Sequence, residues 1–412
     1  MLKVKLVIVG GGPAGLAAAK SAYDAGERDI LILEREAELG GILNQCIHNG
    51  FGLHTFKEEL TGPEYAQRYV TEILARGIIY KLNATVIDVS EAKIVTYVSS
   101  SDGLVQIQAE AIILSCGCRE RPRGAINIAG GRGAGIFNAG TAQKLVNIDG
   151  YMPGKEVVIL GSGDIGLIMA RRMTFEGAVV KAVVELMPYS SGLNRNIVQC
   201  LVDFNIPLMF NHTIIDVRCT EVNEKLQPKL ETAQEIKCDT LLLSVGLLPE
   251  NELAKNAGVK LHNVTGGAEV TDQMMTNIEG VFECGNVLHV HDLVDFVSEE
   301  AEHAGLCAVK YIQGAKVASQ SVTITAQNGV RYVVPQKINL DDDYSPINLK
   351  MRVGNVYKKV DLTVTVDGVK LYSKRRLVVT PGEMETVSLT SEQVKKLKSA
   401  KSIVVELQGG AQ

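Results

Sequence analysis

The 412-residue sequence contains no tryptophan, and no apolar run in it approaches the roughly 18 residues that a membrane-spanning helix needs. An apolar strand begins within a few residues of Met1, which leaves no room for a secretory signal peptide. The net charge of −5 gives no reason to expect nucleic-acid binding. We therefore expect a cytoplasmic protein without a membrane span and without a nucleic-acid partner. A chain of this length suits two or three domains.

The eight cysteines include no C-x-x-C pair, so the sequence indicates neither a zinc ribbon nor a ferredoxin-type cluster. We expect the thiols to be reduced, as is usual in the cytoplasm. The tightest pair, Cys116 and Cys118, follows an apolar run at 111–114, and packing at a strand end is the interpretation that this position favours. No metal site is predicted.

A glycine-rich loop, Gly10–Gly15, follows an apolar strand and opens an alanine-rich helical stretch. Its G-x-G-x-x-G spacing is typical of a dinucleotide-binding β-α-β unit. Gly10 permits the tight turn, Gly12 lets the backbone approach a pyrophosphate, and Gly15 lets helix and strand pack closely. The next strand ends at Glu34, where a carboxylate would accept hydrogen bonds from a ribose. An ordinary turn with a solvated glutamate is the alternative, but the complete order of elements favours nucleotide binding.

The same pattern recurs at Gly161–Gly166, again between an apolar strand and a helical stretch. Glu185 follows this second loop at the spacing that separates Glu34 from the first. Because two glycine loops with their acids in phase are improbable by chance, we predict two nucleotide-binding domains. A carboxylate suits two ribose hydroxyls but repels a 2′-phosphate, and no arginine follows Glu185 directly. The second domain should therefore prefer NAD to NADP.

Other segments of the sequence predict helices and strands of the fold. A helix is predicted over 61–76, opened by a capping box, and its core-facing residues are Tyr65, Tyr69, Ile73 and Leu74. A short strand is predicted at 85–87, and apolar strands at 238–246 and 280–286 each end in glycine. A helix over 298–312 follows, with Ser298 and Glu299 at its start, where its N-terminus would stabilise negative charge on a reduced flavin.

The sequence changes character at about Val317. β-branched runs are separated by Gly, Pro and Asp turns, which predicts a β-rich domain of the sandwich or barrel type. The predicted strands are 322–325, 330–334, 349–353, 360–366 and 376–379, and one helix is predicted at 390–400. Residues 319–412 carry 14 Lys and Arg against 9 Asp and Glu. This excess indicates either a docking surface for an acidic partner or a solvated β surface.

Residues 1–316 resemble the pyridine nucleotide-disulphide oxidoreductase superfamily, whose members are flavoproteins with an NAD domain inserted in an FAD domain. The resemblance rests on the two glycine loops with their acids and on Ser115–Gly117, where the family usually has Ala-Thr-Gly. Ser244–Gly246 resembles the strand that returns the chain to the FAD domain, and Gly285-Asn286 stands where the family has Gly-Asp.

The resemblance implies an α/β fold with two Rossmann-like, three-layer ββα domains and a small C-terminal β-rich domain. It assigns residues 1–118 and 249–316 to an FAD-binding domain, 119–248 to an NAD-binding domain and 319–412 to the β-rich domain. The implied cofactors are FAD and NAD. The residues assigned to them are Gly10, Gly12, Pro13, Ala14, Gly15, Glu34, Arg35, Gly40, Gly41, Ile42, Val86, Cys116, Gly117, Gly161, Gly163, Asp164, Ile165, Gly166, Glu185, Gly246, Gly285, Asn286 and Ser298.

Two departures from the family pattern bear on the chemistry. Members with a redox disulphide carry two cysteines after the Gly-Gly turn at 40–41, and this chain has only Cys46 there, which excludes a dithiol relay at that site. Asn286 in place of aspartate keeps a carbonyl acceptor but loses the charge. Neutral hydrogen bonds contribute about 1 kcal/mol and charged ones roughly twice that, so FAD binding is expected to persist in a weaker form.

The stretch 40–54, with Thr61–Tyr65, resembles flavoprotein subunits found with anaerobic glycerol-3-phosphate dehydrogenase homologues and subunits of dye-linked amino-acid dehydrogenases. The resemblance implies partner subunits that carry iron–sulfur clusters or a second flavin. Relatives with their own cluster have cysteines in the C-terminal region, whereas the last cysteine here is Cys307. Any cluster must then belong to another chain.

No catalytic side chain is assigned. Cys46 would tune the flavin or form a transient adduct if its thiolate were stabilised, and otherwise it only packs. His48 and His54 would line a substrate or acceptor pocket, and His289 and His291 would lie at the flavin edge. One of these histidines is a candidate for proton transfer, but the sequence shows no third or fourth ligand for a metal beside them.

Three functions follow from these observations. The first is an FAD-dependent NAD(H) oxidoreductase that relays electrons to or from a partner. The second is a dehydrogenase that oxidises an amine or a hydroxy acid directly at FAD. The third is a non-catalytic component of an assembly, which binds nucleotide without turning anything over.

Overall fold

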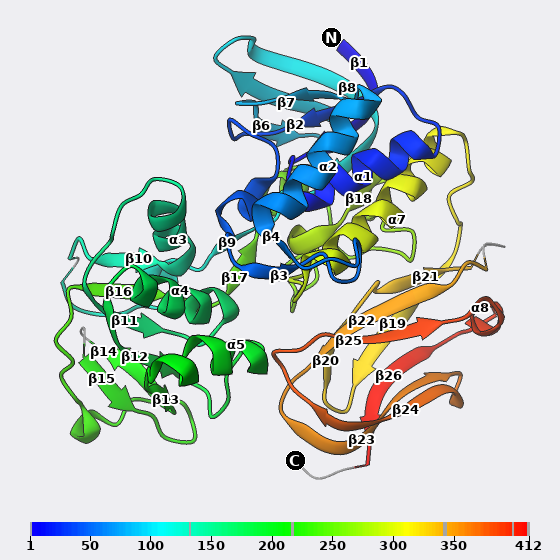
Figure 1. Ribbon diagram of the computed structural model, residues 1–412. Coiled ribbons are helices and arrows are strands. Elements are labelled where there is room, and N and C mark those ends of the chain that lie inside the picture. The colour runs from blue at the N-terminus through cyan, green and yellow to red at the C-terminus, as the bar shows by residue number, and fades with distance from the viewer. Residues whose placement is uncertain (1, 132, 216–217, 341–343, 398, 410–412) are drawn as a thin grey trace. The chain divides into compact units, whose positions relative to one another are not determined.

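The computed structural model describes residues 2–131, 133–215, 218–340, 344–397 and 399–409 (Figure 1). The chain forms two compact units. The first comprises Met1–Asn44, Asn49–Cys118 and Pro249–Gln412, and the second comprises Gln45–His48 and Arg119–Leu248. The chain leaves the first unit along β9 (Cys118–Glu120) and returns along β17 (Leu247–Pro249), and these two strands form a two-stranded sheet.

The α/β part of the first unit is built on a seven-stranded sheet in the order β5-β2-β1-β8-β7-β6, with β18 paired to β8. Its central pairs are parallel, and residues 6–9 of β1 and all of β2 are apolar and buried, as parallel strands covered on both faces must be. Figure 1 shows α1 lying between α2 and α7 beside this sheet. The strands are β1 (Leu2–Val9), β2 (Ile30–Leu33), β5 (Ile79–Lys81), β6 (Thr85–Val89), β7 (Ile94–Ser99), β8 (Gly103–Leu114) and β18 (Val281–Glu283).

The other elements of the α/β part are helices and short strands around the sheet. They are α1 (Pro13–Asp24), η1 (Gly41–Gln45), β3 (Asn49–Phe51), β4 (Leu60–Thr61), α2 (Gly62–Arg76), α6 (Glu252–Asn256), η5 (Gly285–Val287) and α7 (Val294–Ile312). None of the helices that the structure describes is long and apolar enough to span a membrane.

The second unit contains a five-stranded parallel sheet in the order β10-β16-β11-β12-β13. Its strands are β10 (Ile136–Asn138), β11 (Glu156–Leu160), β12 (Val179–Glu185), β13 (Leu208–Phe210) and β16 (Thr240–Leu243). Its other elements are η2 (Arg123–Ala125), α3 (Ala139–Asn147), α4 (Asp164–Phe175), α5 (Asn194–Cys200), η3 (Val202–Phe204), β14 (His212–Ile215), β15 (Arg218–Glu221) and η4 (Leu230–Thr232). The two sheets confirm the predicted α/β fold class with two Rossmann-like folds, each of which contains its own glycine loop.

The C-terminal region forms a β-sandwich, called here the C-terminal sandwich. A five-stranded sheet in the order β21-β19-β26-β23-β24 and a three-stranded sheet in the order β20-β22-β25 share one hydrophobic core. The elements are β19 (Ser321–Gln327), β20 (Val330–Val334), β21 (Lys337–Asn339), β22 (Ile347–Val353), β23 (Tyr357–Val366), β24 (Val369–Val379), β25 (Glu385–Leu389), α8 (Ser391–Leu397) and β26 (Ile403–Gln408). The predicted β-rich architecture is confirmed, but β21, β25 and β26 had no sequence prediction.

The helix predictions hold in part. Thr61 caps α2 through the predicted capping box with Glu64, and Tyr65 and Tyr69 are buried. The assignment of Leu74 to the core is wrong, because its side chain is 53% exposed. The helix predicted to start at Ser298 begins instead at Val294, since the apolar residues before Ser298 continue the helical face that packs on the sheet. The C-terminal helix is shorter than predicted, ending at Leu397.

Helices α1 and α7 approach so closely that a side chain at Gly305 has no room. A Cβ at this position would lie 2.3 Å from the carbonyl oxygen of Ala18. We expect Gly305→Ala to lower the midpoint temperature of thermal unfolding by several degrees, because overpacking costs about 1–3 kcal/mol and outweighs the better helix propensity of alanine. Gly124→Ala is the control, since no atom lies within 4 Å of its Cβ. An equal midpoint for the two variants would contradict the prediction.

Candidate functional site

The first glycine loop is held by the buried carboxylate of Glu34, which is 6% exposed. One oxygen of Glu34 accepts the Gly11 N–H at 2.6 Å, and the other accepts the Glu36 N–H at 2.8 Å. The carboxylate therefore joins the loop at the end of β1 to the end of β2. Its remaining lone pairs are available to ribose hydroxyls, which is the role that the sequence predicts for it.

The second loop repeats this hydrogen bonding at the equivalent positions. Glu185 accepts the Ser162 N–H at 2.9 Å with one oxygen and the Met187 N–H at 2.9 Å with the other. The Ser162 hydroxyl adds a third bond at 2.5 Å, which has no counterpart in the first loop because Gly11 stands there. The repeat seen in the sequence is thus also a repeat of the contacts that hold each loop.

The first glycine of each loop is required by a neighbouring strand end. Gly10 has a φ of +108°, and a Cβ there would lie 2.6 Å from the carbonyl oxygen of Ser115. Gly161 has a φ of +93°, and its Cβ would lie 2.0 Å from the carbonyl oxygen of Ser244. Both positions therefore exclude any side chain, for the same reason in both units.

The helices that follow the loops have N-termini suited to phosphate. Gly12 is the N-cap of α1 and Gly163 is the N-cap of α4, and neither helix has a side-chain cap. Pro13, the first residue of α1, has no N–H, and the Gly166 N–H of α4 donates to the Ser244 hydroxyl at 3.1 Å. The other N–H groups of each first turn lie at the positive end of the helix dipole, where they could donate to a phosphate. A Cβ at Gly12 would meet only the Cα of Gly41, at 3.9 Å, so the backbone leaves room for an extended ligand. These features fit the pyrophosphates of FAD and NAD.

Several predicted site residues already have protein partners. Asp164 accepts hydrogen bonds from the Leu193 N–H at 2.8 Å and the Asn196 side chain at 2.7 Å, so it anchors the loop before α5. Ser298 lies in the second turn of α7, not at its start, and bonds the Tyr65 hydroxyl at 2.8 Å. The expectation that Ser298 opens this helix is therefore wrong, and its assignment to the cofactor site stays a prediction.

Asn286 differs from its sequence interpretation in one respect. Its side-chain oxygen accepts the His291 N–H at 3.0 Å, so the carbonyl acceptor predicted to face the cofactor is engaged within the protein. The amide N–H₂ group of Asn286 is then the part of the side chain without a hydrogen bond to His291. The side chain thus offers a ligand a donor as well as the second lone pair of the acceptor that the sequence suggested.

The other predicted cofactor residues lie around the two loops in varied settings. Ile42 is 56% exposed, Arg35 is exposed beside Glu36, and Val86 is half-buried in β6. Cys116 and Gly117 follow β8, and Gly246 follows β16 in a left-handed conformation. The remaining members lie in or directly beside the loops and helix starts described above: Pro13, Ala14, Gly15, Gly40, Ile165, Gly166 and Gly285.

Cys46 is not set up as a nucleophile. Burial raises the pKa of its thiol to about 12, so the thiolate is disfavoured at neutral pH. Its sulfur lies 3.8 Å from the side-chain oxygen of Gln143. Burial likewise raises the pKa of Cys116 to about 12. The hypothesis of a thiolate adduct at Cys46 therefore loses its physical basis.

The histidines predicted together at 48 and 54 belong to different units. Burial, with the charges of Arg171 and Arg195, lowers the pKa of His48 to about 4, so this imidazole is neutral at pH 7. The backbone N–H of His54 donates to Asp295 in the first turn of α7 at 3.1 Å, and Asp295 also accepts from Gly52 and Thr55. No pattern in the sequence pointed to this loop-holding carboxylate.

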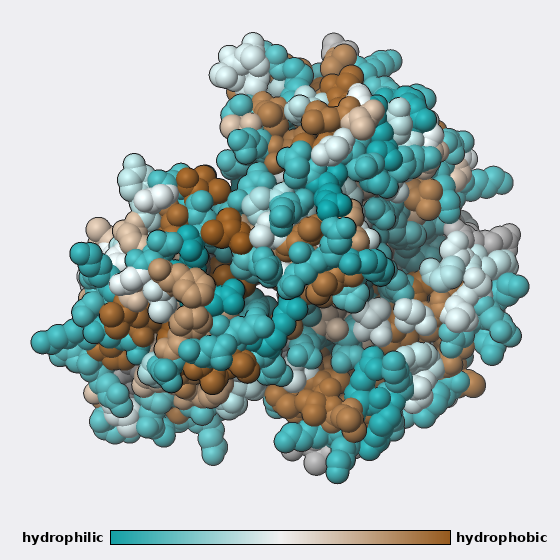
Figure 2. Space-filling model, viewed as in Figure 1, coloured by the Kyte–Doolittle hydropathy of each residue, from teal (hydrophilic) through white to brown (hydrophobic). Residues whose placement is uncertain are grey.

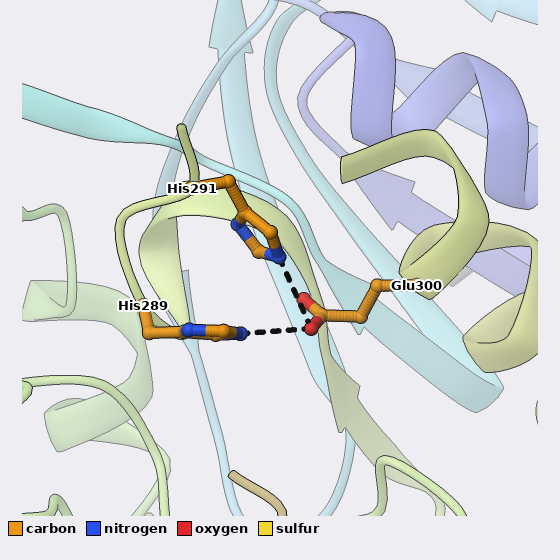
Figure 3. A group of neighbouring side chains, drawn as sticks. All are labelled: His289, His291 and Glu300. Atoms are coloured by element: carbon orange, nitrogen blue, oxygen red, sulfur yellow. Dashed lines mark hydrogen bonds and ion pairs between the residues drawn. The ribbon is translucent and has the colours of Figure 1, made fainter. Parts of the chain in front are cut away.

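His289 and His291 converge on Glu300, a residue of α7 that the sequence did not single out (Figure 3). The Nε2 atoms of the two imidazoles lie 2.8 and 3.2 Å from the same carboxylate oxygen. The Nζ atom of Lys350, on β22, lies 3.5 Å from that oxygen, and the other oxygen accepts the Gly285 N–H at 2.9 Å. All four side chains are buried. We call this set the Glu300 cluster.

The protonation of this cluster follows from burial and charge. Burial alone would raise the pKa of Glu300, but His291, Lys350 and His289 together lower it well below its usual range. Burial lowers the pKa of His291 to about 4, against the opposing effect of Glu300. The cluster at pH 7 therefore pairs one carboxylate with one ammonium, beside a neutral His291. The two histidines and the carboxylate are all metal-ligand types, but an ammonium already neutralises the carboxylate.

The pH dependence of stability follows from His291, which faces Glu300, His289 and Lys350. Its pKa in the folded protein is lower than its ordinary value of 6.5, so the unfolded chain takes up this proton first as pH falls. We expect stability to fall between pH 6.5 and 4 by up to about 3 kcal/mol from this residue. His291→Gln should flatten that part of the dependence, measured as unfolding midpoint against pH. Parallel profiles for wild type and variant would contradict the assignment.

The comparisons with known proteins agree with this geometry. The profile of the pyridine nucleotide-disulphide oxidoreductase family matches residues 4–322. An NAD(P)H coenzyme A polysulfide/persulfide reductase of Pyrococcus horikoshii is 26% identical over 305 residues, which are 71% of this chain and 64% of the relative. The chain thus spans less than two thirds of that relative's length.

Another protein and one solved structure are similar to different extents of this chain. One of the subunits of the opine oxidase of Agrobacterium tumefaciens is 22% identical over 427 residues, covering 96% of this chain and 78% of the relative. The crystal structure of T. acidophilum thioredoxin reductase matches with a TM-score of 0.61 and 20% identity, covering 76% of this chain and 99% of that one. The family profile, the paired loops and the fold together establish that this chain belongs to the pyridine nucleotide-disulphide oxidoreductase family, which uses FAD and NAD(P)H.

Proposed function

We propose that the protein is an FAD-dependent NAD(H) oxidoreductase that relays electrons between nicotinamide and a partner. The observation that carries the proposal is the pair of equivalent loops, each with an uncapped helix N-terminus and a buried acid. A dithiol in this chain is not the expected electron acceptor, because only Cys46 follows the Gly-Gly turn and its thiol has a raised pKa. The electrons would therefore leave for a cofactor in another chain.

The protein contributes mainly position to this chemistry. Bound FAD would supply the hydride and electron-transfer chemistry, so no side chain of this chain would need to act covalently. Glu34 and Glu185 would hold the two riboses, and the N-termini of α1 and α4 would hold the pyrophosphates. The Asn286 amide would donate a hydrogen bond toward the ribityl chain, because its oxygen is bound to His291.

We propose further that the chain works as one member of a multisubunit complex of the glycerol-3-phosphate-dehydrogenase-like kind. The motif at 40–54 suggests this setting, and the likeness to a protein that is itself named as part of an opine oxidase supports such a role over nearly the whole chain. None of the three relatives described above is named for glycerol 3-phosphate. The partner would carry an iron–sulfur cluster or a second flavin.

The edge strand β24 offers a surface for such a partner. Val369 and Leu377 on this strand are 71% and 78% exposed, among lysines and arginines. Figure 2 shows hydrophobic side chains grouped near the bottom of the view, in the part of the picture that Figure 1 gives to the C-terminal sandwich. An exposed edge with apolar side chains is a common place for another chain to bind.

The opine oxidase likeness also favours a second candidate, an FAD-dependent dehydrogenase of an amine or hydroxy acid. Anaerobic titration of the purified holoprotein separates the two. We expect NADH to bleach the flavin absorbance band at one equivalent per FAD. Bleaching by an amine or hydroxy acid, with no response to NADH, would favour the second candidate. A flavin that neither class reduces would leave the non-catalytic role in an assembly.

The preference for NADH is expected to depend on the charge of Glu185. A 2′-phosphate at contact distance would be repelled by roughly 4 kcal/mol at an effective dielectric near 20. We expect Glu185→Gln to raise the NADPH-to-NADH affinity ratio at least tenfold, about 1.4 kcal/mol, measured by flavin reduction at low cofactor concentration. Ser162→Ala is the control, because it removes a bond to the same carboxylate and keeps the charge. An unchanged ratio in Glu185→Gln would refute the NAD assignment.

A further inference from the structure

Strand β22 of the C-terminal sandwich has two faces with different partners. Its odd-numbered residues, including Leu349 and Met351, are apolar and buried in the core of the sandwich. Its even-numbered residues, Asn348, Lys350 and Arg352, are polar and all bond the α/β part of the first unit. Because side chains alternate along a strand, one face builds the sandwich and the other contacts the neighbouring segment.

The even face contacts one continuous stretch of chain, residues 290–300. The Asn348 side chain donates to Glu299 at 2.8 Å, and Lys350 donates to the Phe296 carbonyl at 3.2 Å. Arg352 donates to the Val290 carbonyl at 3.1 Å and forms an ion pair with Asp292.

The neighbouring strand β20 extends this contact. Tyr332 is paired with Arg352 across the sheet, packs in the core of the α/β part, and lies edge-on to His289 with ring centroids 6.3 Å apart. On this face of the three-stranded sheet, Tyr332, Lys350 and Arg352 thus contact the α/β part of the first unit, whereas Asn348 stays exposed to solvent.

Lys350 is linked to the predicted cofactor loop through the Glu300 cluster. Its ammonium pairs with Glu300, and Glu300 holds the Gly285 N–H at 2.9 Å together with both imidazoles. The backbone of His291 in turn holds the Asn286 side-chain oxygen at 3.0 Å. A single chain of contacts therefore runs from the C-terminal sandwich to Gly285 and Asn286.

The charge of Lys350 is what this chain of contacts requires. Glu300 is buried, and a buried carboxylate without a countercharge takes up a proton or draws one onto a neighbouring imidazole. Until that proton is taken up, the unpaired buried carboxylate is destabilised, and so is the loop that it holds at the Gly285 N–H. The lysine ammonium keeps Glu300 ionised and lets the His291 imidazole stay neutral, which fixes one arrangement of the loop.

We propose that Lys350 is a positioning residue for FAD and that the C-terminal sandwich, through it, sets the conformation of the Gly285-Asn286 loop. The proposal rests on the assignment of FAD to that loop and deepens the proposed function. Lys350 itself does not contact the cofactor in this scheme. It acts through Glu300, so its effect depends on charge and not on shape alone.

The test compares Lys350→Met with Lys337→Met in the purified holoprotein. Lys337 pairs with Glu269, 3.3 Å away, and so also joins the sandwich to the α/β part, but at a partly exposed site apart from the Glu300 cluster. FAD release on dilution is followed by its fluorescence between pH 6 and pH 9. We expect Lys350→Met to weaken FAD binding at least tenfold at pH 8 and to recover as pH falls, because a proton on the cluster replaces the ammonium.

Three further variants or measurements separate charge from folding. Lys350→Arg should retain most of the affinity, and Glu300→Gln combined with Lys350→Met should bind FAD more tightly than Lys350→Met alone. The apoprotein of Lys350→Met should show a pH-dependent unfolding midpoint near neutrality that wild type lacks, a readout that stands even if NADH fails to reduce the flavin. Metal analysis of the wild type should find no bound ion.

Three results would overturn the proposal. One is a loss of FAD in Lys350→Met that is equal at all pH values. Another is a loss matched by Lys337→Met. The third is one equivalent of a divalent metal per wild-type chain, because the Glu300 cluster would then be a metal centre and not one neutralised by Lys350.

Discussion

The hydrogen bonds between a buried glutamate and a glycine loop organise both nucleotide folds of this protein. Each carboxylate accepts a loop N–H on one side and a strand-end N–H on the other, so it fixes the distance between two neighbouring β-α connections. The loop then opens a helix whose N-cap side chain forms no capping hydrogen bond, so the positive end of the helix dipole faces the site proposed for the phosphates. In the proposed binding mode, the same carboxylate would bind the ribose and would order the backbone that holds the rest of the dinucleotide. A change at Glu34 or Glu185 therefore affects loop order and ligand recognition together.

The second organising feature is the buried charge of the Glu300 cluster. Buried carboxylates are costly unless they are paired and hydrogen-bonded, and here the partners of Glu300 come from two other segments, the stretch 285–291 and β22. The pairing joins the C-terminal sandwich to α7 and to the loop after β18. This gives the sandwich an electrostatic role inside the first unit, while its edge strand β24 belongs to the other sheet and carries exposed apolar side chains. Under the two proposals, one sheet of the sandwich would serve the cofactor site and the other would serve a partner.

The number and the pKa of the cysteine thiols argue against an electron-accepting disulphide in the segment after Gly41. A redox disulphide needs two adjacent thiols, at least one of them stabilised as a thiolate, and the segment after Gly41 has one cysteine whose pKa is raised by burial. Family membership therefore supplies the cofactors, while the segment after Gly41 lacks the second cysteine that an intrachain disulphide relay needs at that site. A likeness to a reductase and a likeness to part of an oxidase are compatible on this basis, because one nucleotide scaffold can serve different electron partners.

The amino-acid sequence alone determined the two nucleotide loops, their acids, the capped helix α2 and the β-rich character of the last hundred residues. These features depend on contacts within short segments, where glycine spacing, capping residues and alternation act directly. Tertiary structure decided the rest. Helix α7 starts at Val294 and not at the predicted Ser298, because packing on the sheet extends the helix. The side-chain oxygen of Asn286 accepts the His291 N–H, a contact that the sequence does not predict. Glu300 and Lys350 meet only because α7 and β22 pack together, and no local pattern in the sequence records a charge pair between residues fifty positions apart.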